Sequence, residues 1–206
     1  MSGIKDSLRL RRSIRKYKPE PVATELIKTL LETASYAPSA HNAQPWRFII
    51  LTDSEQKNAL ADAMAQAWLE ELEKEHVPKN TRWATVNRSV QRFTTAPVLI
   101  VACLTLEDMQ KYPDVERQNI ERDLAVQSLG AAIQTLLLAA YAEGLGSCWY
   151  CAPNFCKPAV QDALWIPETV EPQAIITLGY ADEEPKVPER NPVDAYVYVE
   201  RWGTPP

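Results

Sequence analysis

The sequence predicts an α+β fold in which a buried sheet lies among more numerous helices. Two continuous apolar runs, at 97–104 and 173–180, have the length and composition of buried strands. The longest helical pattern, at 115–143, is apolar nearly all round in its middle (LGAAIQTLLLAA), which predicts a central buried helix. Strand and helix patterns do not alternate as a regular βαβ series, so we predict one α+β domain over residues 1–206.

The N-terminal half follows from periodicity and from capping residues. Leu26, Leu30 and their neighbours recur at helical spacing, with Thr24 as the expected N-cap, and Pro38 ends that helix. Asp53 or Ser54 is the expected cap of the next long helix. The expected elements are helices at 6–14, 24–36, 53–74 and 83–93, a strand at 46–52 and a loop at 76–80.

The C-terminal half has one clear stop signal, because Gly144 follows the central helix as a C′ glycine. The remaining expected elements are an extended segment at 147–150, a helix at 157–164 and the strand at 173–180. The tail, 181–206, is rich in proline and carries an alternating apolar segment at 195–199. We expect this C-terminal extension to be buried, for example against a second subunit.

Composition and charge narrow the classes of partner. The net charge is −5 and the sequence pI is near 5.2, whereas nucleic-acid-binding proteins usually carry a basic excess. No apolar run approaches the roughly 20 residues of a membrane span, and the N-terminus lacks the apolar region of a signal peptide. We therefore expect a cytoplasmic protein with no nucleic-acid and no membrane partner.

The chain has four cysteines, and three of them lie close together in sequence. Cys103 lies within an apolar run and is expected in the core. Cys148 and Cys151 have CxxC spacing and Cys156 follows, but a zinc site would need a second pair of ligands at suitable spacing. We interpret these cysteines as reduced packing or pocket residues and expect no metal, with a zinc or thiol-redox site as the alternative.

The first candidate site is the basic segment RRSIRKYKP, which includes Arg11, Arg12, Ser13 and Arg15. If the segment is helical, Arg11 and Arg15 share a face at i,i+4 spacing. Two guanidinium groups and a hydroxyl on one face would suit a dianionic phosphate, because arginine offers a planar fork of donors. The alternative is a solvated basic surface or a helix end whose dipole favours cations.

The second candidate site is the turn in APSAHNAQPWRFIIL. Its small residues allow a close backbone approach, and its amides and hydroxyl suit the edge of a flat heteroaromatic ligand. The residues singled out are Pro38, Ser39, Ala40, Asn42 and Gln44. An Asx-turn whose polar groups satisfy their own backbone is the alternative. His41 could be a general acid, although we favour a role as a hydrogen-bonding residue of the loop.

Two further segments add weaker indications. GLGSCWYC ends the long helix and begins an extended segment, in which Tyr150 and Cys151 could line a pocket or pack in the core. It is not a dinucleotide fingerprint, because it follows a helix and not a strand. In the tail, Arg190 and Lys186 could contact a phosphate, and solvated linker charges are the alternative.

Taken together, RRSIRKY, PSAHNAQPWRF, the long helix ending in GLGSCW and the tail arginine resemble the nitroreductase family of flavin enzymes from about Leu8 to Arg201. The resemblance implies a homodimer built on a central, mostly antiparallel sheet. The long helix would form much of the interface, and the C-terminal extension at 181–206 would wrap the partner. Each dimer would hold two FMN molecules at the subunit boundary.

The resemblance also implies roles for individual residues. Arg11, Arg12, Ser13 and Arg15 match the first FMN-binding segment, with Arg11 and Ser13 on phosphate and Arg15 near the N1–C2 edge of the flavin. A second segment, contributed by the other subunit, comprises Pro38, Ser39, Ala40 and Asn42, with Gln44 nearby. Tyr150 and Cys151 would meet the other flavin edge through backbone groups, although CWYCAPNF departs from the commoner glycine-containing forms. Arg190 would be the phosphate contact of the tail.

The activity implied is that of an FMN-dependent NAD(P)H oxidoreductase that reduces a nitroaromatic, a quinone or another flat acceptor by ping-pong chemistry. FMN performs the hydride transfer, so no catalytic acid or nucleophile is assigned. Acceptor-selecting residues are expected at 60–92, where Trp68 and the loop with His76 could cover the flavin. One alternative is a partner of the deazaflavin type, with reduced deazaflavin as donor. The other is a non-catalytic flavin-binding protein.

Overall fold

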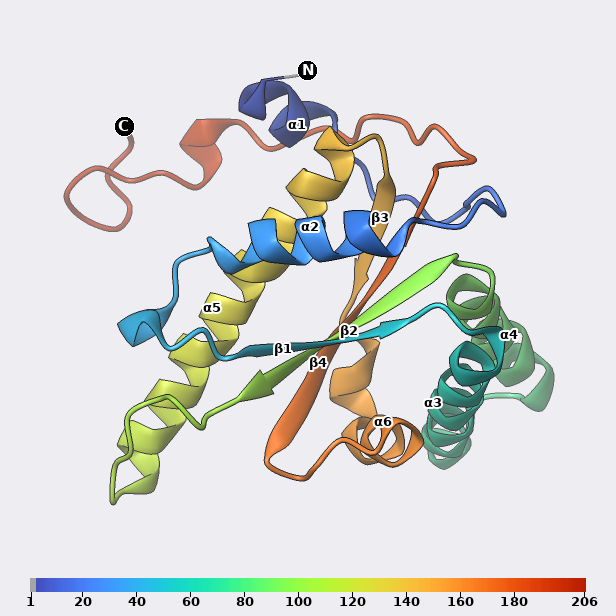
Figure 1. Ribbon diagram of the computed structural model, residues 1–206. Helices are drawn as coiled ribbons and strands as arrows, with labels where there is room; N and C mark the ends of the chain where they lie inside the picture. The colour runs from blue at the N-terminus through green and yellow to red at the C-terminus, as the bar shows by residue number, and fades with distance from the viewer. Residues whose placement is uncertain (1–2) are drawn as a thin grey trace.

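The computed structural model describes residues 3–206 and contains a four-stranded sheet (Figure 1). The strands lie in the order β1-β2-β4-β3, and each neighbouring pair is antiparallel. They are β1 (Trp46–Leu51), β2 (Val98–Thr105), β3 (Gly146–Tyr150) and β4 (Val170–Gly179). The predicted α+β fold is confirmed, as is the antiparallel sheet that the resemblance implies.

Helices cover both faces of this sheet (Figure 1). The α-helices are α1 (Ile4–Leu10), α2 (Thr24–Ser35), α3 (Ser54–Lys74), α4 (Lys79–Thr94), α5 (Val115–Ala142) and α6 (Lys157–Leu164). Short 3-10 turns are η1 (Ala40–Asn42), η2 (Ala152–Phe155) and η3 (Val193–Ala195). Both ends of the described chain lie at the same end of the molecule, beside α1 (Figure 1).

The core divides into two clusters because successive side chains of a strand point to opposite faces. Along β2, Ile100 and Ala102 pack with residues of α2 and α5, whereas Leu99 and Val101 pack with residues of α3, α4 and α6. All eight residues of β2 are buried. The continuous apolar composition of this strand therefore reflects burial on both faces, as the sequence predicted.

Capping side chains fix the two long helices at their start. The carboxylate of Asp53 accepts the backbone N–H of Gln56 at 3.0 Å in front of α3. Asp114 accepts the backbone N–H of Arg117 at 2.9 Å in front of α5. Gly144 has φ +77°, which confirms the glycine stop after α5.

Several expected boundaries are wrong. The first helix ends at Leu10, and Arg11 is already extended with ψ 134°, so the basic segment is not helical. Ala23, and not Thr24, is the N-cap of α2. Helix α4 begins at Lys79, which shortens the expected loop at 76–80. The alternating segment at 195–199 forms no strand, because the chain turns through η3 instead of pairing with an edge.

Helix α5 is more apolar than the sequence analysis allowed. By length and composition it is the one helix within residues 3–206 that could cross a membrane, so the expectation that no segment approaches that size is wrong on this criterion. In this structure it packs on β2 and β3 and on α2, and core helices pass the same test. Less than half of its most apolar window is buried within the chain, which leaves apolar surface uncovered.

Candidate functional site

The basic segment lies in extended form along the outer edge of β3. Ser13 forms a parallel bridge with Ser147, and the backbone N–H of Ile14 donates to the carbonyl of Ser147 at 3.0 Å. A Cβ at Gly146 would lie 2.9 Å from Ile14, so only glycine permits this approach. The structure thus replaces the expected helical face with an extended segment bridged to β3 at Ser13, in which residues 11, 13 and 15 are spaced to share one side of the chain.

The beginning of the tail holds the basic segment on its other side. The carboxylate of Glu183 accepts the backbone N–H of Arg15 at 2.5 Å and that of Lys16 at 3.1 Å. Two backbone bonds, from Asp182 to Lys16 at 3.0 Å and from Lys18 to Tyr180 at 2.9 Å, complete the pairing. Glu183 carries no sequence signal for this contact, because nothing local relates it to a segment 168 residues earlier.

Arginine side chains gather where these segments meet. Burial lowers the pKa of Arg11, and the neighbouring charges of Arg12 and Arg190 lower it further. The guanidiniums of Arg11, Arg12, Arg15 and Arg190 form no ion pair with a carboxylate in the described part of the chain. Like charges held together without an internal counter-charge create a site for an anion. Arg190 of the tail therefore lies near enough to Arg11 for its charge to act on the pKa of that residue, and its contact with a phosphate stays a prediction.

Polar atoms beside this cluster are buried without hydrogen-bond partners. Among the described residues these atoms are Arg12 Nε, Ser147 Oγ and the hydroxyl of Tyr150. Burial raises the pKa of Tyr150, while the nearby positive charges of Arg15 and Arg92 act in the opposite direction. Buried polar atoms in proteins nearly always have partners, so a cluster of orphans marks a place where a polar ligand would supply them.

The second predicted segment is anchored on α5. The backbone N–H of Ala40 donates to Ser128 Oγ at 3.1 Å, and the backbone N–H of Gln44 donates to Ser39 Oγ at 3.1 Å. His41, Asn42 and Gln44 all have positive φ, between 46° and 56°. Residues other than glycine pay energy for this conformation, which clusters at binding sites where the surroundings enforce it. The turn is thus a held, strained loop, with Asn42 and Gln44 exposed.

His41 lies beside a buried carboxylate. Its Nε2 is 3.4 Å from Oε1 of Glu121, whose side chain is 5% exposed, and the other carboxylate oxygen accepts the backbone N–H of Gln110 at 3.3 Å. The imidazole therefore ties the turn to α5. The role of His41 as a hydrogen-bonding residue of the loop stays a prediction.

The two predicted segments do not meet within one chain. The arginine segment lies beside β3, just after the end of α5, whereas the turn at 38–44 contacts Ser128 in the middle of that helix. The helix between Ser128 and Ala142 extends for roughly 20 Å, at a rise of about 1.5 Å per residue. The turn that carries Pro38, Ser39, Ala40, Asn42 and Gln44 is thus separated from the basic segment that carries Arg11, Arg12, Ser13 and Arg15.

A cavity of about 530 Å³ opens between α3, α4 and η2. Its apolar walls include Met64, Trp68, Val90, Phe93, Ala152 and Phe155, and its polar lining residues are Glu71, Glu75 and Ser89. No cationic side chain from residues 3–206 lines it. The ring of Phe93 packs edge-on against Tyr150 with centroids 5.3 Å apart. One wall of the cavity therefore packs against the end of β3, and most of the lining comes from the region 60–92.

The cysteines form no cluster with other ligands. All four are free, Cys103 and Cys148 are buried, and Cys151 is exposed. Burial raises the pKa of Cys103 to about 12, as expected for an inert core thiol. No group of three or more candidate metal-binding side chains occurs among the residues from Gly3 to Pro206.

The sheet, the central helix and the arginine-lined edge of β3 together define an oxidoreductase fold. The model of the Nitroreductase family matches residues 8–180, and the chain belongs to this family. The match spans the basic segment, the turn at 38–44 and all four strands.

Curated relatives and a solved structure cover nearly the same length. A Bacillus subtilis (strain 168) protein provisionally named NAD(P)H nitroreductase YfhC is 31% identical over 192 residues, 93% of this chain and 91% of its own. An Archaeoglobus fulgidus protein provisionally named NADH dehydrogenase/NAD(P)H nitroreductase is 31% identical, covering 84% and 83%. A BluB-like flavoprotein of Clostridium difficile 630 superposes with a TM-score of 0.80 at 25% identity, covering 98% and 100%.

Proposed function

We propose that this protein is a cytoplasmic, FMN-dependent NAD(P)H oxidoreductase that reduces a flat organic acceptor. The observation that supports it most directly is the cluster of Arg11, Arg12 and Arg190, which has no internal counter-charge and lies beside orphaned buried polar atoms. The names of the two curated relatives support the nicotinamide donor. The flavoprotein with the same fold supports the flavin.

The residues present fit FMN. A phosphate dianion matches the guanidiniums of Arg11 and Arg190 together with the hydroxyl of Ser13, because bidentate arginine contacts suit phosphate oxygens. The unpartnered hydroxyl of Ser147 belongs to the residue that bridges Ser13, and that of Tyr150 lies further along β3, near the charges of Arg15 and Arg92. The exposed amides of the strained turn are suited to the heteroatoms of a flavin ring.

We propose that the second half of each site comes from a partner subunit in a homodimer. The turn at 38–44 and the arginine segment lie too far apart along α5 to enclose one flavin ring within a chain. Helix α5 leaves much apolar surface uncovered, and Ile120, Leu138 and Trp149 are exposed or half-buried there. A second copy packed on α5 would cover this surface and bring its own turn to the arginine segment.

When bound, FMN supplies hydride and electron transfer between donor and acceptor. The protein contributes position and electrostatics. The guanidinium of Arg15 would lie against the N1–C2 edge, where a fixed positive charge stabilises the negative charge that develops there. No side chain is assigned as an acid or a nucleophile. Donor and acceptor would bind in turn over one exposed face, which gives ping-pong kinetics.

The cavity between α3, α4 and η2 is the proposed acceptor pocket. Its volume lies in the usual range for small-molecule sites, and its lining favours apolar, planar molecules over anionic ones. Trp68 lines it, as the proposed cover of the flavin requires, whereas the loop residue His76 does not. Nitroaromatics and quinones match this lining.

An absorbance spectrum of the purified protein, followed by anaerobic titration with NADH and NADPH, tests the proposal. We expect flavin absorption that bleaches with a nicotinamide donor and returns on adding a quinone. If the flavin bleaches only with reduced deazaflavin, the electron donor is a deazaflavin and not a nicotinamide. Stable flavin colour without turnover would indicate a flavin-binding protein, and no colour after incubation with excess FMN would contradict the proposal.

A further inference from the structure

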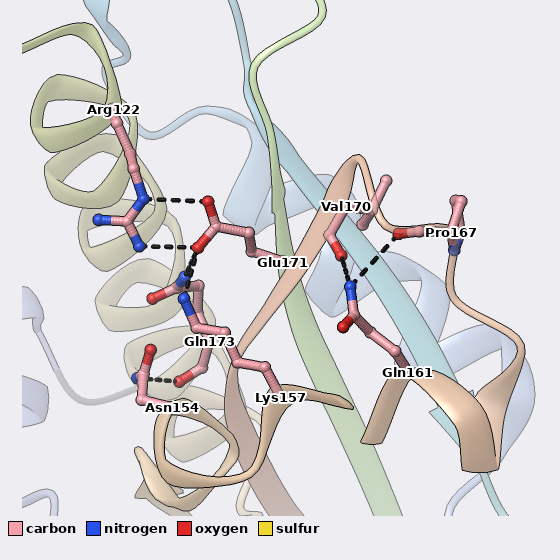
Figure 2. Close-up of polar contacts among 8 residues, drawn as sticks. All are labelled: Arg122, Asn154, Lys157, Gln161, Pro167, Val170, Glu171 and Gln173. Carbon is pink, nitrogen blue, oxygen red and sulfur yellow. Dashed lines mark hydrogen bonds and ion pairs between the residues drawn. The ribbon is translucent and has the colours of Figure 1, made fainter. Parts of the chain in front are cut away.

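We propose that Glu171, Gln173 and Asn154 are positioning residues that hold η2, the turn after β3, in a fixed place beside the flavin. This inference rests on the proposed function, because η2 begins directly after Tyr150 and Cys151 and lines the proposed acceptor pocket through Ala152 and Phe155. The three residues connect η2 to α5 and α6 through a chain of polar contacts (Figure 2).

The connection depends on an irregularity in β4. Ala102 of β2 pairs with Ala174, but the next residue, Cys103, pairs with Pro172, so Gln173 is an extra residue opposite β2. Pro172 has no N–H to give to a ladder, and β-bulges redirect side chains next to functional sites. Pairing with β3 ends at Ile175, so the carbonyl of Gln173 is available to a residue outside the sheet.

That carbonyl accepts the side chain of η2. Asn154 Nδ2 donates to the carbonyl oxygen of Gln173 at 2.7 Å, the one side-chain hydrogen bond from η2 to another element within residues 3–206. Inside the turn, Asn154 N–H donates to Cys151 at 3.1 Å, and the Cys156 thiol lies 3.6 Å from the carbonyl of Ala152. The backbone N–H of Cys156 also donates to the carbonyl of Pro153 at 3.1 Å, so the bonds inside the turn are local and the Asn154 side chain alone joins η2 to the sheet by a side-chain hydrogen bond within residues 3–206.

Glu171 holds Gln173 in turn. The carboxylate accepts two bonds from Arg122 of α5, at 3.0 and 2.7 Å, and one from Lys157 of α6 at 2.5 Å. The side-chain amide of Gln173, which is 7% exposed, donates to the same carboxylate at 3.2 Å. Figure 2 shows Glu171 at the centre of these contacts, with Asn154 reaching Gln173 from the turn.

This arrangement is suited to fixing a position and not only to adding stability. A carboxylate with two cations and an amide has few alternative geometries, because each donor restricts the others. Arg122 comes from α5, the proposed dimer helix, and Lys157 begins α6. The bulge therefore gives η2 a single orientation relative to the elements that form the rest of the site.

Two variants break the chain of contacts, and one variant controls for loss of a nearby bond. Asn154→Ala removes the link from η2. Glu171→Gln removes the negative charge at the centre of the hub, which is the group formed by Glu171, Arg122, Lys157 and Gln173. Gln161→Ala is the matched control, since its amide bonds the carbonyls of Val170 and Pro167 at 3.0 and 3.5 Å without touching η2 (Figure 2). Melting temperatures would show that all three variants fold.

The first measurement uses the protein without FMN. Hydrogen exchange of the amides at 152–156, and the labelling rate of the half-buried Cys156 thiol, should rise about fivefold in N154A and E171Q, as expected for the loss of one hydrogen bond. Q161A should match the parent protein. Unchanged exchange in both test variants would overturn the inference, whether or not the protein binds flavin.

The second measurement uses the FMN-loaded protein. In N154A and E171Q we expect about fivefold weaker FMN binding and a displaced midpoint potential of the bound flavin. Q161A should have the same FMN affinity and midpoint potential as the parent protein. Faster exchange combined with unchanged FMN affinity and potential would overturn the link between the hub and the cofactor. Failure of the parent protein to bind FMN would contradict the proposed function alone, and the exchange data would still decide whether the hub holds η2.

Discussion

The backbone N–H of Ala40 donates to the hydroxyl of Ser128 over 3.1 Å and fixes the strained turn on the middle of α5. The same hydroxyl donates to the carbonyl of Leu124 at 2.7 Å. Ser128→Ala should therefore leave a half-buried amide unpaired, lower the free energy of unfolding by about 1 kcal/mol and weaken FMN binding several-fold.

Thr33→Val provides the control for this variant, because the Thr33 hydroxyl bonds only to the carbonyl of Thr29 in its own helix. Isothermal titration with FMN and denaturant unfolding measure both effects. If S128A and T33V bind FMN equally well, the turn at 38–44 is not part of the flavin site.

The arginine cluster should recognise the phosphate of FMN and not its ring. Arg11→Gln and Arg190→Gln should each weaken FMN binding by about 10- to 100-fold, since a charge-assisted hydrogen bond contributes roughly 1.5–3 kcal/mol. Binding of riboflavin, which lacks the phosphate, should stay unchanged in both. Lys18→Gln neutralises a charge in the same segment and should bind FMN as the parent does. Equal losses for FMN and riboflavin would place these arginines elsewhere.

The cavity between α3, α4 and η2 should control the acceptor and not the donor. Ala65 lines the cavity, so Ala65→Leu should reduce its volume and slow flavin reoxidation by a quinone at least about tenfold, as expected for overpacking of an apolar site. Stopped-flow traces of the donor half-reaction should match the parent. Ala63→Leu on the same helix, outside the lining, is the control. Slowing only the donor step would assign the cavity to the nicotinamide.

Helix α5 should hold two copies of the chain together. Leu138 is half-buried and belongs to neither core cluster, so Leu138→Glu would place a charge on the proposed interface while leaving the core intact. Light scattering should show that this variant is a monomer. The monomer should also fail to retain flavin, because each proposed site needs both subunits. A dimer with bound FMN in this variant would exclude α5 as the interface.

The hub at Glu171 should make the free energy of unfolding depend on pH. Hydrogen bonds from Arg122 lower the pKa of Glu171 from 4.5 to about 2. Because this pKa is depressed in the folded chain, the stabilisation is complete above pH 4.5 and is lost as the pH falls toward 2. Glu171→Gln should cost about 2 kcal/mol at pH 7 and much less at pH 2.5. Denaturant unfolding at both pH values measures this, and an equal cost at both would contradict it.

Local patterns predicted most of the framework. The runs at 97–104 and 173–180, the helix after Asp53 and the glycine after α5 are governed by periodicity, caps and φ, which a single sequence carries. The helix expected at 6–14 ends at Leu10, because the bridge partner of Ser13 is Ser147, on a strand 134 positions away. Helical spacing of arginines carries no information about such pairing.

The candidate site was only partly accessible to sequence reasoning. Residue types single out Arg11, Ser39 and Asn42 in two candidate segments, but they carry no information on the distance between those segments. Ser128 and Glu183 act through single contacts with remote backbone, and neither stands in a motif. The bulge at Gln173 had one sequence signal, the proline inside an otherwise apolar strand at EPQAIITLG.

The bond from the Arg15 backbone to Glu183 also sets an order of events during synthesis. A ribosome releases the N-terminal arginines first, yet their partners on the tail emerge only when most of the polypeptide has been translated. Until then the edge of the sheet that they join is unfinished, since β4 precedes Glu183 by only a few residues. The nascent chain thus completes the arginine-lined edge of its sheet last.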